Sequence, residues 1–247
     1  MRKILPLLTL IVLASCAGAQ KDNKITHTQL DGEVDYVALK DLIFAEQTVL
    51  EINQIIEDSI KQRDPSWEHF ATIEQSIKDD KSAAAIEQSL QALADSSLGS
   101  RQKLWLCNQL RALGHKASEE VVYGLILEVP QQNTLEYLAI YDDHGARYIN
   151  YTGKVGVWEV PEDSAMNELI DKTLDQSKQY LEISNFLLPG RNKNPTYKVR
   201  FNFLTNQGIK QTSMTFEELD DPSNQLSNIF LSGAQVLMRI VEEMEKQ

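Results

Sequence analysis

The spacing of hydrophobic residues changes close to Glu120. From residue 35 to residue 113, apolar residues recur every three or four positions, which is typical of amphipathic helices. After Glu120, short segments rich in β-branched and aromatic residues alternate with turn clusters, which is typical of strands. We therefore predict an α+β fold, with an N-terminal helical region at 35–114 and a sheet domain at 115–247.

The helical region is predicted to contain four helices. No glycine or proline interrupts residues 35 to 63, so one long amphipathic helix is expected there. Asp64 and Pro65 then offer an N-cap and a first helical residue for a second helix. A third helix is expected over 80–96, and a fourth that ends at Gly114 as its C-cap. The residues expected to face inward from the third helix are Ile86, Leu90 and Leu93.

The sheet domain is predicted to be a four-strand meander, a helix, a hairpin and a last helix, with the helices packed on one face of an antiparallel sheet. Pro161 ends the meander, and Asp221-Pro222 precedes the last helix. The four strands are expected at 121–129, 133–141, 146–151 and 154–160.

The hairpin formed from residues 197–216 can be predicted almost to its register. A two-residue loop at Gln207-Gly208 would place Phe203 opposite Thr212 and Phe201 opposite Met214. All large apolar side chains of both strands would then share one face, whereas a three-residue loop would split them between two faces.

The first residues predict export. Arg2 and Lys3 precede an apolar run from Ile4 to Ala14, which is much shorter than the roughly 20 residues needed to cross a bilayer. A basic start, a short apolar stretch and small residues are the parts of a signal peptide. Leu13-Ala14-Ser15-Cys16 resembles the lipobox of bacterial lipoprotein precursors.

This resemblance covers only residues 1–16, and it implies that Cys16 is lipidated. Signal residues 1–15 would be removed, Cys16 would carry a diacylglyceryl thioether, and its new amine would be acylated, for example with palmitate. Residues 16–34 are mostly polar and show no sustained hydrophobic period, which indicates a flexible tether. In such lipoproteins of bacteria with two membranes, an aspartate directly after the lipidated cysteine favours retention in the inner membrane. Ala17 occupies this position instead, so the resemblance implies a location in the outer membrane, facing the periplasm.

A second processing site remains open. Ala17-Gly18-Ala19 also fits a signal-peptidase site, and cleavage before Gln20 would release a soluble periplasmic or secreted protein.

Charge and motifs limit the possible functions. A net charge of −12 repels the phosphate backbone, so we exclude nucleic acid as a main partner. The chain has no P-loop, G-x-S-x-G elbow, H-E-x-x-H pair or G-x-G-x-x-G turn, and its four histidines are scattered singly. No cofactor or metal is therefore expected. Asp142, Asp143 and His144 form the only dense titratable cluster, which we interpret as a polar hairpin tip.

Two groups of residues are candidates for binding. Tyrosines that could line a ligand cleft or an interface, or simply fill the sheet, are Tyr123, Tyr137, Tyr141, Tyr148 and Tyr151. A basic stretch without acidic residues, which could bind an acidic partner or be a solvated hairpin face, contains Arg191, Lys193, Lys198, Arg200 and Lys210. Cys107 has no disulfide partner if Cys16 is lipidated, and we expect it to be buried.

These features favour a membrane-anchored, non-catalytic binding or accessory module of the bacterial envelope, with an envelope protein as a candidate partner. The alternative is a small-molecule sensor or carrier with a pocket under the sheet. An enzyme whose residues meet only in the fold is the third hypothesis.

Overall fold

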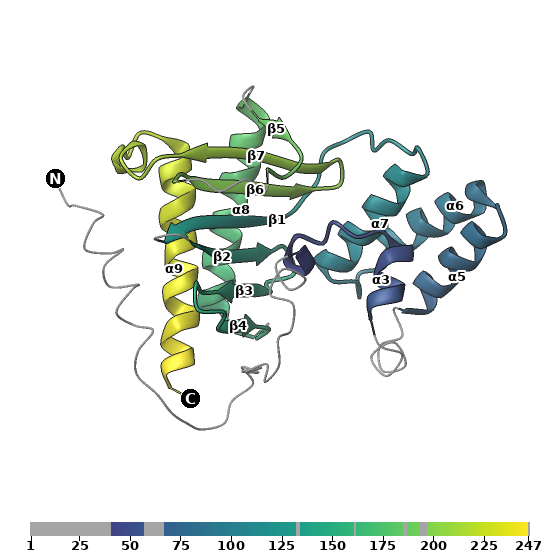
Figure 1. The fold of residues 1–247 in the computed structure, drawn as a ribbon, viewed down its shortest axis with the longest axis horizontal. Helices are drawn as coiled ribbons and strands as arrows, with labels where there is room; N and C mark the ends of the chain where they lie inside the picture. The colour runs from purple at the N-terminus through teal and green to yellow at the C-terminus, as the bar shows by residue number, and fades with distance from the viewer. Residues whose placement is uncertain are drawn as a thin grey trace.

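The protein has three layers, with a sheet between a pair of long helices and a group of shorter helices (Figure 1). The computed structural model describes residues 41–56, 67–131, 134–160, 162–184, 187–192 and 197–246. The signal sequence, Cys16, the tether, Asp64, Pro65 and Lys193 lie outside these residues.

The central layer is a seven-stranded antiparallel sheet in the order β4-β3-β2-β1-β6-β7-β5. The predicted α+β class and the four-strand meander are confirmed. The strands are β1 (Val122–Gln131), β2 (Thr134–Tyr141), β3 (Ala146–Ile149), β4 (Val155–Trp158), β5 (Leu188–Pro189), β6 (Val199–Thr205) and β7 (Gly208–Met214).

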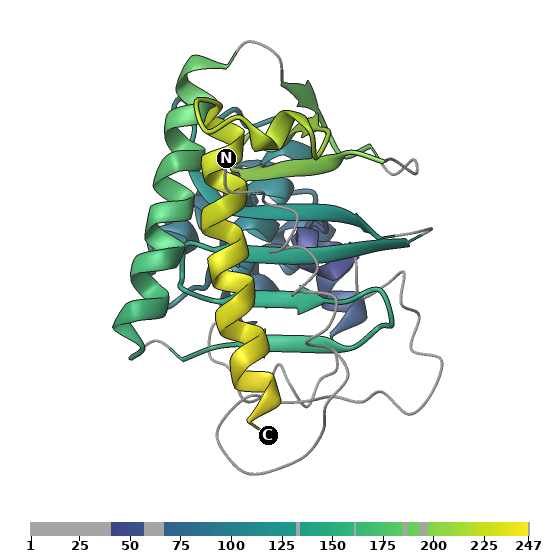
Figure 2. The same ribbon diagram turned by 90° about the vertical axis from the view of Figure 1, so that its left-hand side faces the viewer.

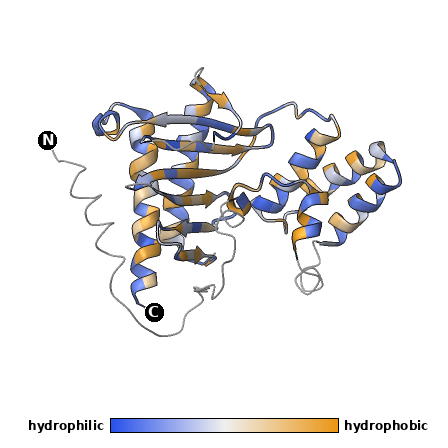
Figure 3. Cartoon of the chain, in the orientation of Figure 1, coloured by the Kyte–Doolittle hydropathy of each residue, from blue (hydrophilic) through white to orange (hydrophobic). Residues whose placement is uncertain are grey.

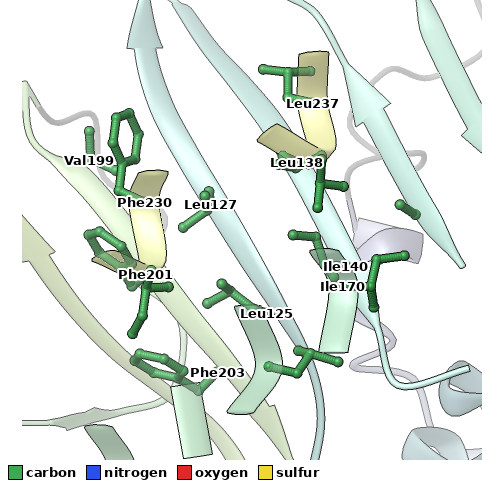
Figure 4. Packing of buried hydrophobic residues seen from close by; sticks show 14 of the residues in the cluster. Leu125, Leu127, Leu138, Ile140, Ile170, Val199, Phe201, Phe203, Phe230 and Leu237 are labelled. Carbon is green, nitrogen blue, oxygen red and sulfur yellow. The ribbon is translucent and has the colours of Figure 1, made fainter. Parts of the chain in front are cut away.

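Two long helices, α8 (Ser164–Ile183) and α9 (Gln225–Glu245), cover one face of the sheet. Figure 2 shows them side by side along that face. Asp163 and Asn224 cap their N-termini by accepting hydrogen bonds from backbone amides. The core under these helices contains the apolar side chains that alternate along the central strands (Figure 4). It includes Leu125, Leu127, Leu138, Ile140, Val199, Phe201 and Phe203.

The opposite face of the sheet is also covered, because the helical region packs against it. A second core joins helical residues such as Phe44 and Trp105 to sheet residues such as Ile126 and Tyr141. The central strands therefore bury both of their faces, and in Figure 3 much of the strand surface has hydrophobic colours. The helices are α3 (Val49–Ile55), α5 (Trp67–Lys78), α6 (Ser82–Leu93) and α7 (Ser100–Ala112).

The prediction of one continuous helix through residues 41–56 is wrong. Residues 41–44 form a helical turn, Ala45 has φ +48, and α3 begins only after Thr48. Thr48 and Glu51 form a capping box, a sequence signal for a helix start. The break is held by Asn108, whose Nδ2 donates to the carbonyl oxygens of Ala45 (2.6 Å) and Gln47 (2.8 Å).

The inward face of α6 also differs from the prediction. Leu90 is 43% exposed, and the buried side chains are the small residues Ala85, Ser89 and Ala92. Small side chains let neighbouring helices pack closely. The buried face of α6 is therefore made of the residues one position before Ile86, Leu90 and Leu93. At the end of α7, Gly114 has φ +82, and the His115 amide donates to the Leu110 carbonyl, which confirms the predicted glycine C-cap.

The hairpin of β6 and β7 keeps the predicted face but not the predicted register. Phe201 lies opposite Thr212, and Phe203 lies opposite Lys210, because the loop consists of Asn206 and Gln207. Gly208 follows this loop with φ +116. The Thr205 hydroxyl accepts from the Gln207 amide and donates to the Gly208 carbonyl, which fixes the turn. A shift of two residues preserves the face, so the apolar pattern alone cannot detect it.

We expect Thr48→Ala to lower the free energy of unfolding by about 1 kcal/mol, because it removes the side-chain cap of α3. Urea denaturation followed by circular dichroism would measure this change. Thr72→Ala is the matched control, since the exposed Thr72 hydroxyl only donates back to the Glu68 carbonyl within α5. Equal losses in the two variants would contradict the assigned capping function.

Candidate functional site

Two arginines of the basic stretch, Arg191 and Arg200, form ion pairs with acidic residues from elsewhere in the chain. Arg200 on β6 lies directly across from Glu128 on β1, and its Nη1 is 3.0 Å from Glu128 Oε2. Both residues are almost fully buried, at 3% and 1% exposure. Burial raises the pKa of Glu128, although the charges of Arg200 and Arg191 oppose this effect.

The buried pair extends into a hydrogen-bond network that fastens residues 190–192 to the sheet. Asn202 Nδ2 donates to Glu128 Oε1 (3.0 Å), and Gln211 Nε2 donates to Asn202 Oδ1 (2.6 Å). Arg200 Nη1 donates to the Asn192 carbonyl (2.7 Å), while the Asn192 amide donates to Gln211 Oε1 (3.3 Å). Apart from the exposed Asn192, these residues are buried, where unpaired polar groups are costly, and their pairing fixes this loop.

Arg191 connects this loop to the first described segment of the chain. Its Nη1 lies 2.6 Å from Asp41 Oδ1 and 3.2 Å from Glu46 Oε2. Its guanidinium lies over the Phe44 ring, 3.6 Å from the ring centroid, which adds a cation–π contact. Phe44 in turn meets Tyr137 edge to face, with the ring centroids 6.5 Å apart. Arg191 therefore holds residues 41–46 against the sheet.

The remaining basic residues are spread over different surroundings. Lys210 Nζ forms a 2.6 Å ion pair with Glu120, and Lys198 is exposed. Hydrogen bonds from Thr215 lower the pKa of Glu218, and the charge of Lys198 lowers it further. The structure thus does not bring the described basic residues together on one surface. The acidic partners of Arg191, Arg200 and Lys210 are distant in sequence. The composition of the basic stretch alone therefore could not indicate these ion pairs.

The tyrosines are divided between the two faces of the sheet. Tyr123, Tyr137 and Tyr141 pack with the helical region, whereas Tyr148 belongs to the core under α8 and α9. Tyr151 is 41% exposed. The Tyr141 hydroxyl donates to the Ile43 carbonyl at 2.5 Å, and burial raises the pKa values of Tyr141 and Tyr123 to about 12. The five tyrosines therefore do not all line one cleft, but Tyr137 and Tyr148 both line the cavity described next.

A partly open cavity lies between the sheet and α9, and Glu136 and Tyr148 are among its lining residues. Its volume is about 30 Å³. The Glu136 carboxylate accepts hydrogen bonds from the Tyr148 side chain and the Tyr151 backbone, while burial raises its pKa. The other lining residues, four of which are labelled in Figure 4, are Leu127, Val129, Gln131, Tyr137, Leu138, Phe230, Ala234 and Leu237. The sequence pattern did not single out Glu136.

The acidic turn after β2 joins the sheet to helices on both sides. Asp143 Oδ2 accepts from the Ser100 amide (2.8 Å) at the start of α7, and Asp143 Oδ1 accepts from the Gly145 amide (3.1 Å). His144 Nε2 lies 2.9 Å from Asp171 Oδ1 on α8. Within the described residues, no group of three or more His, Cys, Asp or Glu residues could hold a metal ion.

Cys107 is buried at 3% exposure, as expected. Burial raises the pKa of its thiol to about 11, which keeps it protonated at neutral pH. The helices that the structure describes include none with the length and hydrophobicity required to cross a membrane.

The chain matches no family model, and comparisons with curated proteins and with solved structures also gave no match. Its function is therefore inferred from its own residues.

Arg200→Met should lower the free energy of unfolding by about 3–5 kcal/mol, because it leaves the buried Glu128 carboxylate without a counter-ion. Lys210→Met is the matched control. Its ion pair with Glu120 is 31% and 24% exposed, so the expected loss is at most about 1 kcal/mol. Urea unfolding of both variants tests this ranking. Similar losses would show that the Glu128–Arg200 pair does not depend on burial as we describe.

Proposed function

We propose that the protein is a bacterial envelope lipoprotein, anchored through Cys16, that acts as a non-catalytic binding or accessory module. The anchor is supported by the Leu13-Ala14-Ser15-Cys16 sequence that directly follows the apolar run. Two or three acyl chains hold a protein on a membrane where one chain alone would not. Residues 16 to 40 limit the distance between anchor and body to about 85 Å, the reach of a fully extended chain.

The contacts of Arg191 fix the segment by which the tether enters the folded part of the chain. Asp41, Phe44 and Glu46 follow the tether in sequence, and all three contact Arg191. These contacts would join the tether to the folded body at one place.

One observation carries the binding function. The three most exposed large apolar side chains of the described residues are Ile183 (64%) at the end of α8, and Leu188 (62%) and Tyr197 (88%) in the connection that follows it. Isolated exposed apolar residues are common, but the occurrence of three within residues 183–197 favours a contact surface. Exposed Lys198 lies beside Tyr197 in sequence and would add a positive charge to such a surface. We assign partner binding to residues 183–198.

The cavity beside Glu136 argues for this function over the alternative of a small-molecule carrier. Pockets for metabolite-sized ligands have volumes of roughly 300–1,000 Å³. The cavity has about 30 Å³, which is room for a water-sized group.

Cys16→Ala should release the protein from the membrane fraction and abolish incorporation of radiolabelled palmitate, because no thioether can form. The Cys107→Ala variant is the matched cysteine control, and it should remain acylated and membrane-bound. Mass spectrometry of the mature N-terminus would identify the processing site. If the Cys16→Ala protein still fractionated with membranes and kept the same mass, the proposed lipid anchor at Cys16 would be wrong.

The double variant Leu188→Ser/Tyr197→Ser should lose the envelope proteins that crosslink to the wild type. The control, Val121→Ser/Tyr151→Ser, changes residues that are 43% and 41% exposed but lie outside the proposed surface. We expect it to keep the same crosslinked neighbours, as identified by mass spectrometry. If both double variants kept these neighbours equally, binding through residues 183–198 would be wrong.

A further inference from the structure

We propose that Arg191 couples the tether-entry segment, residues 41–46, to the partner-binding residues 183–198, so that undocking of this segment weakens partner binding. This regulation deepens the proposed function and rests on its binding surface, but it does not depend on the lipid anchor. Arg191 itself belongs to residues 183–198, and it is 150 positions away from Asp41 in the sequence.

The burial of the Arg191 ion pairs is unequal. The Arg191 side chain is only 7% exposed, whereas its partners Asp41 and Glu46 are 33% and 35% exposed. Glu128 also attracts Arg191, but its carboxylate is already paired with Arg200. A buried guanidinium that loses its counter-ions is costly, so it moves toward water. Undocking of the tether-entry segment would therefore displace Arg191.

The residues next to Arg191 carry part of the proposed binding surface. Leu188, which is 62% exposed, pairs with Gln211 as the first residue of β5. The Gly190 amide donates to the Ile209 carbonyl at 2.7 Å. Because β5 has only two residues, few backbone hydrogen bonds hold this stretch in place. Displacement of Arg191 would therefore also loosen Leu188.

The tether-entry segment docks in one defined arrangement. The Phe44 ring lies under the Arg191 guanidinium, with 3.6 Å to the ring centroid, and meets Tyr137 edge to face. The Ile43 carbonyl accepts a hydrogen bond from the Tyr141 hydroxyl. Coupling between two sites is reciprocal. A partner that binds the docked arrangement more tightly would therefore also hold the tether-entry segment against the sheet.

The test measures hydrogen–deuterium exchange of the purified full chain, which requires neither a membrane nor a partner. The double variant Asp41→Asn/Glu46→Gln removes both counter-ions of the guanidinium. We expect it to accelerate exchange in the peptide that covers residues 184–192 by about tenfold or more. Strand β1 should exchange at the wild-type rate in this variant, because the coupling is local.

A matched control and a double-mutant cycle separate coupling from general destabilisation. Glu120→Gln removes a partly exposed ion pair with Lys210 on β7, and it should exchange like the wild type. Arg191→Met should reproduce the acceleration, and combining it with Asp41→Asn/Glu46→Gln should add nothing, because all three residues act through one cluster. Wild-type exchange in the double variant, additive effects, or equal acceleration in β1 would overturn the coupling.

Crosslinking in the envelope distinguishes this inference from the proposed function. Asp41→Asn/Glu46→Gln should recover about tenfold fewer of the neighbours that Leu188→Ser/Tyr197→Ser loses, since both act on the same surface. If only Leu188→Ser/Tyr197→Ser lost these neighbours, the proposed binding surface would stand and the coupling would be wrong. If neither double variant lost them, the binding surface would be wrong, and this inference with it.

Discussion

A sheet that is buried on both faces constrains every other part of this protein. The central strands meet α8 and α9 on one side and the helical region on the other, so successive side chains along each strand enter two different cores. Leu138 and Ile140 point to one core, and Tyr137 and Tyr141 point to the other. Any charged group on these strands must therefore find its partner inside the protein.

This constraint explains the contrasting environments of the two buried glutamates. Glu128 faces the helical side, where Arg200 on the neighbouring strand neutralises it and Asn202 completes its hydrogen bonds. Glu136 faces α9, where its described partners are a tyrosine side chain and a backbone amide. The same residue type thus forms an ion pair with Arg200 on one face and accepts hydrogen bonds from Tyr148 and Tyr151 on the other. The Glu128–Arg200 pair also fixes the loop that carries Arg191, because Arg200 donates to the Asn192 carbonyl.

Some differences between prediction and structure concern contacts between elements that are far apart in sequence, whereas the register of the β6–β7 hairpin is local. The break at Ala45 depends on Asn108 in α7, although the Thr48-Glu51 capping box was visible in the sequence. The basic stretch loses its apparent positive surface because Asp41, Glu46, Glu120 and Glu128 come from other segments. The register of the hairpin differs from the prediction by two residues, but the same side chains share a face. The alternation along a strand specifies only which face of the sheet a side chain points to.

By itself, the sequence determined the fold class, the four-strand meander, the two long helices and the glycine that ends α7. These features follow from local periodicity, turn residues and caps, which act over a few residues. Only the tertiary structure decided that the helical region covers the second face of the sheet, that Arg191 and Arg200 are buried in ion pairs, and that Glu136 lies in an apolar cavity. The physical reason is that burial and charge pairing depend on which distant surfaces meet, and hydrophobic periodicity specifies a buried face without specifying its partner.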